Sequence, residues 1–170
     1  LPHNLARHAL PGFFIGFAKS EKLAEMANSI IQGKAIAKAM NVNVLHPHNQ
    51  VDVLNKTFRE AQVIIDISTS LPVARYLARD AAGTARRISA YLNPAGRDVV
   101  ILAEDEKRKN TLDCLEMQYY RYLINEPAFE NHLKHEDGRV RYARSCRDVS
   151  STIPQDLIAM HAAIGSRKIN

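Results

Sequence analysis

Hydrophobic and polar residues recur along the chain at helical spacing in some segments and at strand spacing in others, a pattern that predicts an α/β fold. Residues 20–40 carry apolar side chains at helical spacing and Lys and Glu residues on the opposite face. We therefore expect a long amphipathic helix there, with Ser20 as its N-cap. A short strand is predicted at residues 42–45 and a short helix at residues 51–59.

The clearest strand is predicted at residues 61–67, where a continuous apolar run is typical of a strand buried on both faces of a parallel sheet. Ser68-Thr69-Ser70 follows the run, and Pro72 then favours the first turn of a helix. In open α/β sheets, ligands bind just beyond the carboxyl ends of the strands, where helix N-termini present free N–H groups. We therefore expect a ligand site near Asp66, at the end of this strand.

The second half of the chain is predicted to contain a β-hairpin and two helices. Residues 87–92 and 98–103 have strand patterns and are joined by Asn93-Pro94-Ala95-Gly96, a favourable turn. Residues 111–125 carry apolar and aromatic side chains at helical spacing, which indicates a packing face. The last helix follows Pro154, and its packing side is expected to hold Leu157, Ile158, Ala162 and Ile164.

The composition favours one globular domain over residues 1–170. Of the 170 residues, 46% are hydrophobic and 24% are charged, which is enough to bury a sizeable core. No apolar run reaches the roughly 18 residues of a membrane span, so we expect a cytoplasmic protein without membrane contact. The net charge of +5 suits a nucleotide phosphate, whereas the scattered Lys and Arg residues argue against nucleic-acid binding.

A candidate nucleotide site lies at the start of the chain. Asn4 and Arg7 occur on one short stretch, and Lys19 follows Gly16 at the head of the long predicted helix. An amide can orient a triphosphate, a guanidinium can clamp it and an ammonium can neutralise its charge. Because Leu1 is not an initiator Met and no glycine-rich turn precedes this stretch, we expect the phosphate-binding loop upstream and the chain to be a fragment.

The cysteines and two closely spaced histidines are further candidates for site chemistry. Cys146 is flanked by arginines and shortly precedes a helix, surroundings that favour a reachable thiolate nucleophile; a buried structural cysteine is the alternative. Cys114 lies among the leucines of the helix predicted at residues 111–125, where an inert core thiol is expected. His132 and His135 lack the carboxylate or third histidine of a metal site, so solvated side chains are expected.

Taken together, these motifs resemble the adenylation domain of ThiF, MoeB and ubiquitin-activating enzymes. The shared features are Asn-Leu-x-Arg-His at residues 4–8, Gly-x-x-Lys at residues 16–19, an apolar strand ending in Asp-x-Ser/Thr, and a late Cys-x-x-x-Ser followed by Pro and a helix containing His. The resemblance covers nearly the whole chain. It implies an α/β, Rossmann-like three-layer domain with a mostly parallel sheet, here lacking its first strand, loop and helix.

The resemblance implies a nucleotide role for three residues near the start of the chain. Asn4, Arg7 and Lys19 match the positions that contact ATP in the family, with His8 in place of the usual Gln. Arg7 would in addition act in catalysis by stabilising the charge that builds on the phosphates in the transition state.

The strand at residues 61–67 departs from the family pattern. The Asp-Asn pair that helps to hold magnesium in the family aligns with Thr69-Ser70, and the nearby carboxylate is Asp66. Since a magnesium and phosphate centre needs oxygen ligands, Asp66 is the candidate for contact with the nucleotide and its Mg²⁺. A plain strand-end carboxylate is the alternative.

The resemblance also implies a second chemical step. Cys146 matches the cysteine that takes the activated protein as a thioester, with Pro154 and His161 in the places of the Pro and His that follow it. The implied reaction is ATP-dependent adenylation of the C-terminal carboxylate of a ubiquitin-like or sulfur-carrier protein, followed by thioester capture. The absence of zinc-binding cysteine pairs indicates bacterial relatives with a ubiquitin-conjugating-like domain upstream, and the family implies a homodimer.

A binding module without catalytic activity is the alternative function. In that case, a Rossmann-like unit that has lost its phosphate loop would serve for dimerisation or partner binding. Arg7 and Lys19 would then be ordinary solvated surface charges.

Overall fold

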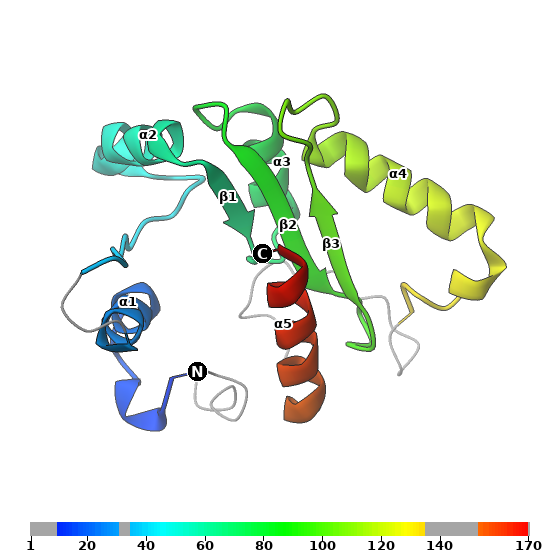
Figure 1. Cartoon of the computed structure of the whole chain (residues 1–170), viewed down its shortest axis with the longest axis horizontal. Helices are drawn as coiled ribbons and strands as arrows, with labels where there is room; N and C mark the ends of the chain where they lie inside the picture. Colours follow the sequence, from blue (N-terminus) through cyan, green and yellow to red (C-terminus); the bar gives the residue numbers. More distant parts are fainter. Residues whose placement is uncertain (1–9, 31–34, 135–152, 170) are drawn as a thin grey trace. The chain divides into compact units, whose positions relative to one another are not determined.

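The computed structural model describes residues 10–30, 35–134 and 153–169, which divide between two compact units, Leu1–Pro47 and His48–Asn170 (Figure 1). The described residues form helices and a mixed three-stranded sheet, as the α/β prediction requires. The prediction of one domain over residues 1–170 stays a prediction. None of the described helices is long and apolar enough to cross a membrane.

The first unit contains a short 3-10 helix, η2 (Gly12–Phe14), and helix α1 (Lys19–Ile30). The helix predicted at residues 20–40 is therefore correct in its first half and wrong at residues 35–40, which are not helical. Asn28 explains the difference, because its side-chain amide donates to the carbonyl of Ala37 (2.9 Å) and accepts from the N–H of Ala37 (2.8 Å). These bonds fix the backbone of Ala37 beside the side chain of Asn28.

Two further predictions for the first unit are wrong. Ser20 lies inside α1, which begins one residue earlier, and is therefore not the N-cap. Residues 42–45 form a turn region instead of a strand: the N–H of His46 donates to the carbonyl of Asn43 (3.0 Å), and the N–H of Leu45 donates to the Asn43 side chain (3.0 Å). A side-chain acceptor that satisfies a nearby N–H competes with strand pairing.

The second unit holds the sheet and most of the helices. Its elements in chain order are η3 (His48–Gln50), α2 (Val51–Glu60), β1 (Val63–Asp66), α3 (Leu71–Arg79), β2 (Arg86–Leu92), β3 (Val99–Ala103), α4 (Leu112–Asn125), η4 (Pro127–Phe129) and α5 (Gln155–Ile169). The predicted helices at residues 51–59 and 111–125, the helix after Pro72 and the helix after Pro154 are confirmed.

The sheet has the order β1-β2-β3, with β1 parallel to β2 and β2 antiparallel to β3. The predicted hairpin is therefore confirmed. Tyr91 of β2 packs against Tyr119 of α4, whereas Val99 of β3 lies on the other face of the sheet, under Gly165 of α5. Helices α3 and α4 thus cover one face and α5 crosses the other, giving three layers (Figure 1).

Strand β1 is at the edge of the sheet, which corrects the prediction that it is buried on both faces. Ile64 and Asp66 face α3, but Val63 and Ile65 lie on the opposite face and are 44% and 48% exposed. Helix α5 packs against β3 and does not cover that part of the sheet. The apolar run thus predicted the strand correctly and its surroundings wrongly.

Apolar side chains from the strands and from α2, α3 and α4 form the core of the second unit. Its buried members are Leu54, Phe58, Leu77, Ala78, Ala85, Ile88, Val100, Leu112 and Leu123. The packing side of α5 differs from the prediction, because Ala162 and Ile164 are exposed while His161 and Gly165 are buried. Gly165 faces the sheet, where an added Cβ would make an ordinary contact with Val99 at 3.9 Å.

Arg87 and Glu104 are fully buried, and both form hydrogen bonds with backbone groups of the loops around the sheet. The Glu104 carboxylate accepts the N–H groups of Arg87 (3.1 Å) and Leu112 (3.0 Å) and the guanidinium of Arg108 (2.6 Å). The Arg87 guanidinium donates to carbonyls in and after α3, those of Leu77, Ala81, Ala82, Gly83 and Ala85. Burial lowers the pKa of Arg87, the charge of Arg108 adds to this, and Glu104 opposes it.

Candidate functional site

The carboxyl end of β1 is the first candidate site, because the chain passes from a parallel strand to a helix N-terminus there. Thr69 has a left-handed backbone (φ 57°), which is uncommon for a β-branched residue and costs free energy. Ser70, the N-cap of α3, makes no side-chain hydrogen bond to the first turn. The first turn of α3 therefore keeps N–H groups that an anionic ligand could use.

Asp66 lies at the base of this turn, 6% exposed. Its Oδ1 accepts the N–H of Ser68 (2.9 Å), and the Ser68 hydroxyl accepts the N–H of Ser70 (3.2 Å). Oδ2 of Asp66 makes no hydrogen bond with the described residues, so one carboxylate oxygen is left for another ligand. The described residues contain no group of three or more His, Cys, Asp or Glu side chains that could hold a metal ion. The metal role of Asp66 stays a prediction.

The residues predicted to contact the nucleotide are only partly described. Lys19 is the first residue of α1, is exposed, and follows a turn in which Gly16 has φ 96°. Asn4 and Arg7 lie outside the described residues. Lys19 and Asp66 belong to different units. A shared site formed by these residues stays a prediction.

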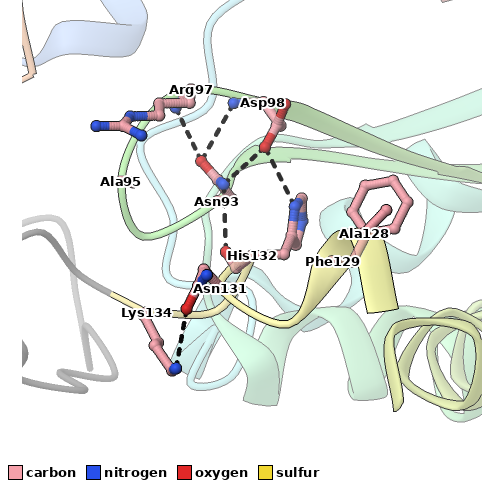
Figure 2. A pocket seen from close by; sticks show the side chains of 9 residues that line it. All are labelled: Asn93, Ala95, Arg97, Asp98, Ala128, Phe129, Asn131, His132 and Lys134. Carbon is pink, nitrogen blue, oxygen red and sulfur yellow. Dashed lines mark hydrogen bonds and ion pairs between the residues drawn. The ribbon is translucent and has the colours of Figure 1, made fainter. Parts of the chain in front are cut away.

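A second candidate is a pocket of about 590 Å³ between the β2–β3 turn and the chain after α4 (Figure 2). The lining residues are Asn93, Ala95, Arg97, Asp98, Ala128, Phe129, Asn131, His132 and Lys134. Its lining mixes polar and apolar groups and includes charged residues of both signs, Arg97, Lys134 and Asp98.

His132 forms a buried hydrogen-bond chain beside this pocket, which corrects the prediction of a solvated side chain. Its Nδ1 lies 3.1 Å from Asp98 Oδ2, and its Nε2 lies 2.9 Å from the hydroxyl of Tyr119. His132 is 9% exposed. Burial raises the pKa of Tyr119 to about 12, so the phenol is protonated at neutral pH and can donate to the imidazole.

Sequence reasoning missed this Asp98, His132 and Tyr119 chain because its members are distant in the sequence. The turn motif beginning at Asn93 was the available signal, since it brings Asp98 to the start of β3. Nothing in the local pattern places His132, five residues beyond the start of η4, against that turn. The pairing depends on where α4 ends.

The structure tests the prediction for one of the two cysteines. Cys114 is exposed at the third residue of α4, with the hydroxyl of Thr111 3.5 Å from its sulfur, which corrects the prediction of a core thiol. The leucines around it in the sequence face the core because helical spacing turns Cys114 away from Leu112. Cys146, the predicted nucleophile, lies outside the described residues.

His161, which the family resemblance places after the cysteine, lies on the buried side of α5. It is 5% exposed, and neither ring nitrogen has a hydrogen-bond partner among the described residues. Burying an imidazole nitrogen without a hydrogen-bond partner costs about 1–3 kcal/mol.

Comparison with known protein families and curated sequences identified no relative of this chain. The chain matches no protein-family model, and no curated protein sequence matches it significantly.

Proposed function

We propose that the chain belongs to an enzyme that uses ATP to adenylate the C-terminal carboxylate of a ubiquitin-like or sulfur-carrier protein and then captures the acyl group on Cys146. The observation that carries the proposal is the end of β1. There a buried carboxylate with one uncommitted oxygen, a left-handed Thr69 and an uncapped helix N-terminus come together. This is the place where Rossmann-like α/β domains bind nucleotides.

The proposed fold is a more specific version of the three-layer α/β arrangement described above. The three layers and the parallel β1 and β2 pair are compatible with a Rossmann-like adenylation domain whose first strand, loop and helix lie upstream. We propose a cytoplasmic homodimer, in a protein that also carries a ubiquitin-conjugating-like domain. The motifs at residues 4–8 and 16–19 support this assignment alongside the strand end.

In the first proposed step, a carboxylate oxygen of the partner protein attacks the α-phosphorus of ATP. The bond from the α-phosphorus to the bridging oxygen breaks, and pyrophosphate leaves with that electron pair. Arg7 and Lys19 would stabilise the charge that builds on the phosphate oxygens, and Asn4 would orient the nucleotide. Asp66 fits as a ligand of Mg²⁺, which is commonly held by one or two carboxylates and the substrate phosphates, and which neutralises phosphate charge.

In the second proposed step, the Cys146 thiolate attacks the acyl carbon of the mixed anhydride. The thioester forms as the bond from the acyl carbon to the AMP oxygen breaks, and AMP leaves with the electron pair. The thiol proton passes to solvent before the attack. The neighbouring arginines in the sequence support a thiolate at this position.

Exchange of radiolabelled pyrophosphate into ATP tests the first step, using the chain extended upstream to include the expected phosphate-binding loop. Arg7→Ala and Lys19→Ala should each slow exchange at least about a hundredfold, because loss of one clamp donor costs about 3 kcal/mol of transition-state stabilisation. Lys56→Ala is the matched control, since Lys56 is an exposed lysine of α2. Near-normal exchange in both variants would refute the roles assigned to Arg7 and Lys19, whereas no exchange in the unaltered extended protein would refute adenylation and favour the non-catalytic module.

Asp66→Asn tests the metal role in the same assay. The variant should need a higher magnesium concentration for half-maximal exchange, because an amide is a poorer ligand for Mg²⁺ than a carboxylate. Asp98→Asn, which changes a carboxylate at the hairpin, is the control. An unaltered magnesium dependence in Asp66→Asn would assign Asp66 to the strand-end turn alone.

A further inference from the structure

Strand β1 carries large apolar side chains along its outer edge, the side of the strand that faces away from β2. Val63 and Ile65 are 44% and 48% exposed, and Ile67, just beyond the strand, is 72% exposed. Among the described strands, only β2 pairs with β1 (Figure 1). The other edge strand of the sheet, β3, holds only buried and half-buried side chains. The apolar surface of the sheet is therefore concentrated at the outer edge of β1.

The backbone of the same residues points to this outer edge. In a parallel pair, alternate residues of a strand direct their N–H and C=O groups toward the neighbouring strand. The N–H of Arg86 in β2 donates to the carbonyl of Gln62 (3.3 Å), and Val63 lies in register with Arg86. The backbone groups of Gln62 and Ile64 thus face β2, whereas those of Val63 and Ile65 face outward.

These groups define the chemistry of what can cover the edge. An outward row of N–H and C=O groups pairs with another extended backbone. The exposed side chains of the same residues favour a partner strand that has an apolar side chain at every second position. Edge strands that stay unpaired often carry Lys or Pro, and neither occurs among residues 63–66. The outer edge is therefore suited to strand addition.

A second copy of the chain meets this requirement with its own β1. Two β1 strands related by a two-fold axis perpendicular to the sheet run antiparallel and keep their uncovered faces on the same side. Outward-facing residues must lie opposite each other, which places Val63 of one copy opposite Ile65 of the other, with Ile64 at the axis. Each such pair exchanges both backbone hydrogen bonds and brings two apolar side chains into contact.

The charges favour this register over the neighbouring one. With Ile64 at the axis, Asp66 of one copy lies opposite Gln62 of the other, whose amide can donate to a carboxylate. With Ile65 at the axis, the two Asp66 residues would be diagonal neighbours about 7–8 Å apart, where like charges repel. That register would also extend the pairing to Ile67, beyond the end of β1.

We propose that the outer edge of β1 is an interface between two copies of this chain, formed by antiparallel pairing of β1 about Ile64. The pairing makes one continuous sheet through both copies and covers Val63 and Ile65. A homodimer is part of the proposed function, and this inference names its interface. The pairing itself is argued from β1 and does not depend on adenylation.

Sedimentation equilibrium of the 170-residue chain measures the dimer, and two variants target the interface. Ile65→Lys places a charge on the apolar edge, and Val63→Pro removes an outward N–H without removing a bond to β2. Each should raise the dissociation constant of the dimer at least about tenfold, because the change occurs twice in a symmetric interface. Ile124→Lys, at an 83% exposed residue of α4, is the control and should stay within about twofold of wild type. Circular dichroism checks that all three variants are folded.

Cysteine variants test the register. Val63→Cys and Ile65→Cys are made separately in a background with Cys114→Ser and Cys146→Ser, and one of the two proteins carries an affinity tag. Oxidised with copper phenanthroline, the mixture should form the mixed disulfide about fivefold faster than either variant links to itself, because the Cα atoms of an opposite pair are about 5.5 Å apart. Faster self-linking of Ile65→Cys would place Ile65 at the axis and overturn the register.

Amide hydrogen exchange distinguishes a second copy from another strand. The N–H groups of Val63 and Ile65 should exchange more slowly at concentrations at which the chain is dimeric than after dilution. A chain that is monomeric at all concentrations, or a dimer that Ile65→Lys and Val63→Pro leave unchanged, overturns the proposal. Protection that appears only when the chain is extended upstream would assign the edge to a strand of that extension and would also overturn it.

Pyrophosphate exchange keeps this inference distinct from the proposed function. A dimer with the expected variant effects, in a protein that shows no exchange when extended upstream, would support the interface and refute adenylation. Normal exchange in a protein that is monomeric at all concentrations would support adenylation and overturn the interface.

Discussion

Arg87 brings a cationic guanidinium into the interior of the second unit, where five backbone carbonyls and the charge of Glu104 offset the loss of water. Most of these carbonyls belong to the end of α3 and the loop that follows it. A buried charge with all of its partners contributes little net free energy of folding. Removing one partner destabilises the protein strongly, because the charge is then left buried without compensation. The arrangement therefore specifies where the loops lie.

Glu104→Gln should destabilise the second unit by about 3–5 kcal/mol, because the amide cannot accept from Arg108 and the N–H groups of Arg87 and Leu112 as the carboxylate does. Urea unfolding followed by circular dichroism measures the change. Glu106→Gln, at an exposed neighbour, should stay within about 0.5 kcal/mol of wild type. Equal stability of the two variants would show that the network around Glu104 is not essential.

Tyr119 predicts a pH dependence of stability. Burial raises the pKa of Tyr119 to about 12 in the folded protein, against about 10 in the unfolded chain. Its contribution is therefore complete below pH 10 and is lost as the pH rises toward 12. Tyr119→Phe should flatten the fall of unfolding free energy over this range by about 1 kcal/mol, after allowing for the partial exposure of the ring.

Urea unfolding at pH 9, 10 and 11 measures the slope for Tyr119→Phe. Tyr122→Phe, at a tyrosine that is 55% exposed on the same helix, is the control and should keep the wild-type slope. An unchanged slope in Tyr119→Phe would mean that the phenol ionises as it does in water.

At the scale of elements, two glycines of the second unit show how packing sets the role of a residue. An added Cβ at Gly83 would lie 2.7 Å from the carbonyl oxygen of Phe58 and 2.8 Å from Cα of Arg59, and the backbone φ is 81°. Gly165 lies inside α5, and an added Cβ would make an ordinary contact with Val99. The loop between α3 and β2 can approach the end of α2 only because Gly83 has no side chain.

Gly83→Ala should therefore destabilise the second unit by more than about 1 kcal/mol, since backbone strain and overpacking add. Gly165→Ala should be neutral or stabilise it by up to about 1 kcal/mol, because alanine restricts the unfolded chain and favours a helix. Thermal and urea unfolding of both variants measure the difference. The opposite order would mean that the approach of the loop to α2 is looser than described.

Local sequence patterns were sufficient to predict some of the helices and strands but not the end of α1. The hairpin, α2, α3 and α4 follow from turn residues and apolar spacing, which act over a few residues. The helix at residues 20–40 was predicted too long because its apolar spacing continues beyond Ile30. The hydrogen bonds between Asn28 and Ala37 join positions nine residues apart, and helical periodicity does not indicate them.

At the scale of the whole molecule, the chain combines a small N-terminal unit with a three-layer unit that carries the sheet. Within the second unit, Asp66 lies at the end of an edge strand and His132 lies at the hairpin, so the two candidate sites belong to different parts of the sheet. The proposed function assigns adenylation to the first site.

The sequence by itself determined the class of fold, the hairpin, a strand within residues 61–67 and the helices that follow Pro72 and Pro154. These depend on side-chain size, turn chemistry and period, which are local properties of the chain. The sequence also indicated the candidate nucleotide residues Asn4, Arg7, Lys19 and Asp66 and the nucleophile Cys146, whose joint site stays a prediction.

Only the tertiary structure decided which of these residues are buried. It placed Val63 and Ile65 on an uncovered face because α5 packs against β3 instead, and it buried His132 because Asp98 and Tyr119 meet there from different elements. It left Cys114 exposed because the buried side of α4 is set by the sheet. Burial and long-range hydrogen bonding depend on the packing of distant segments, and no local pattern contains that information.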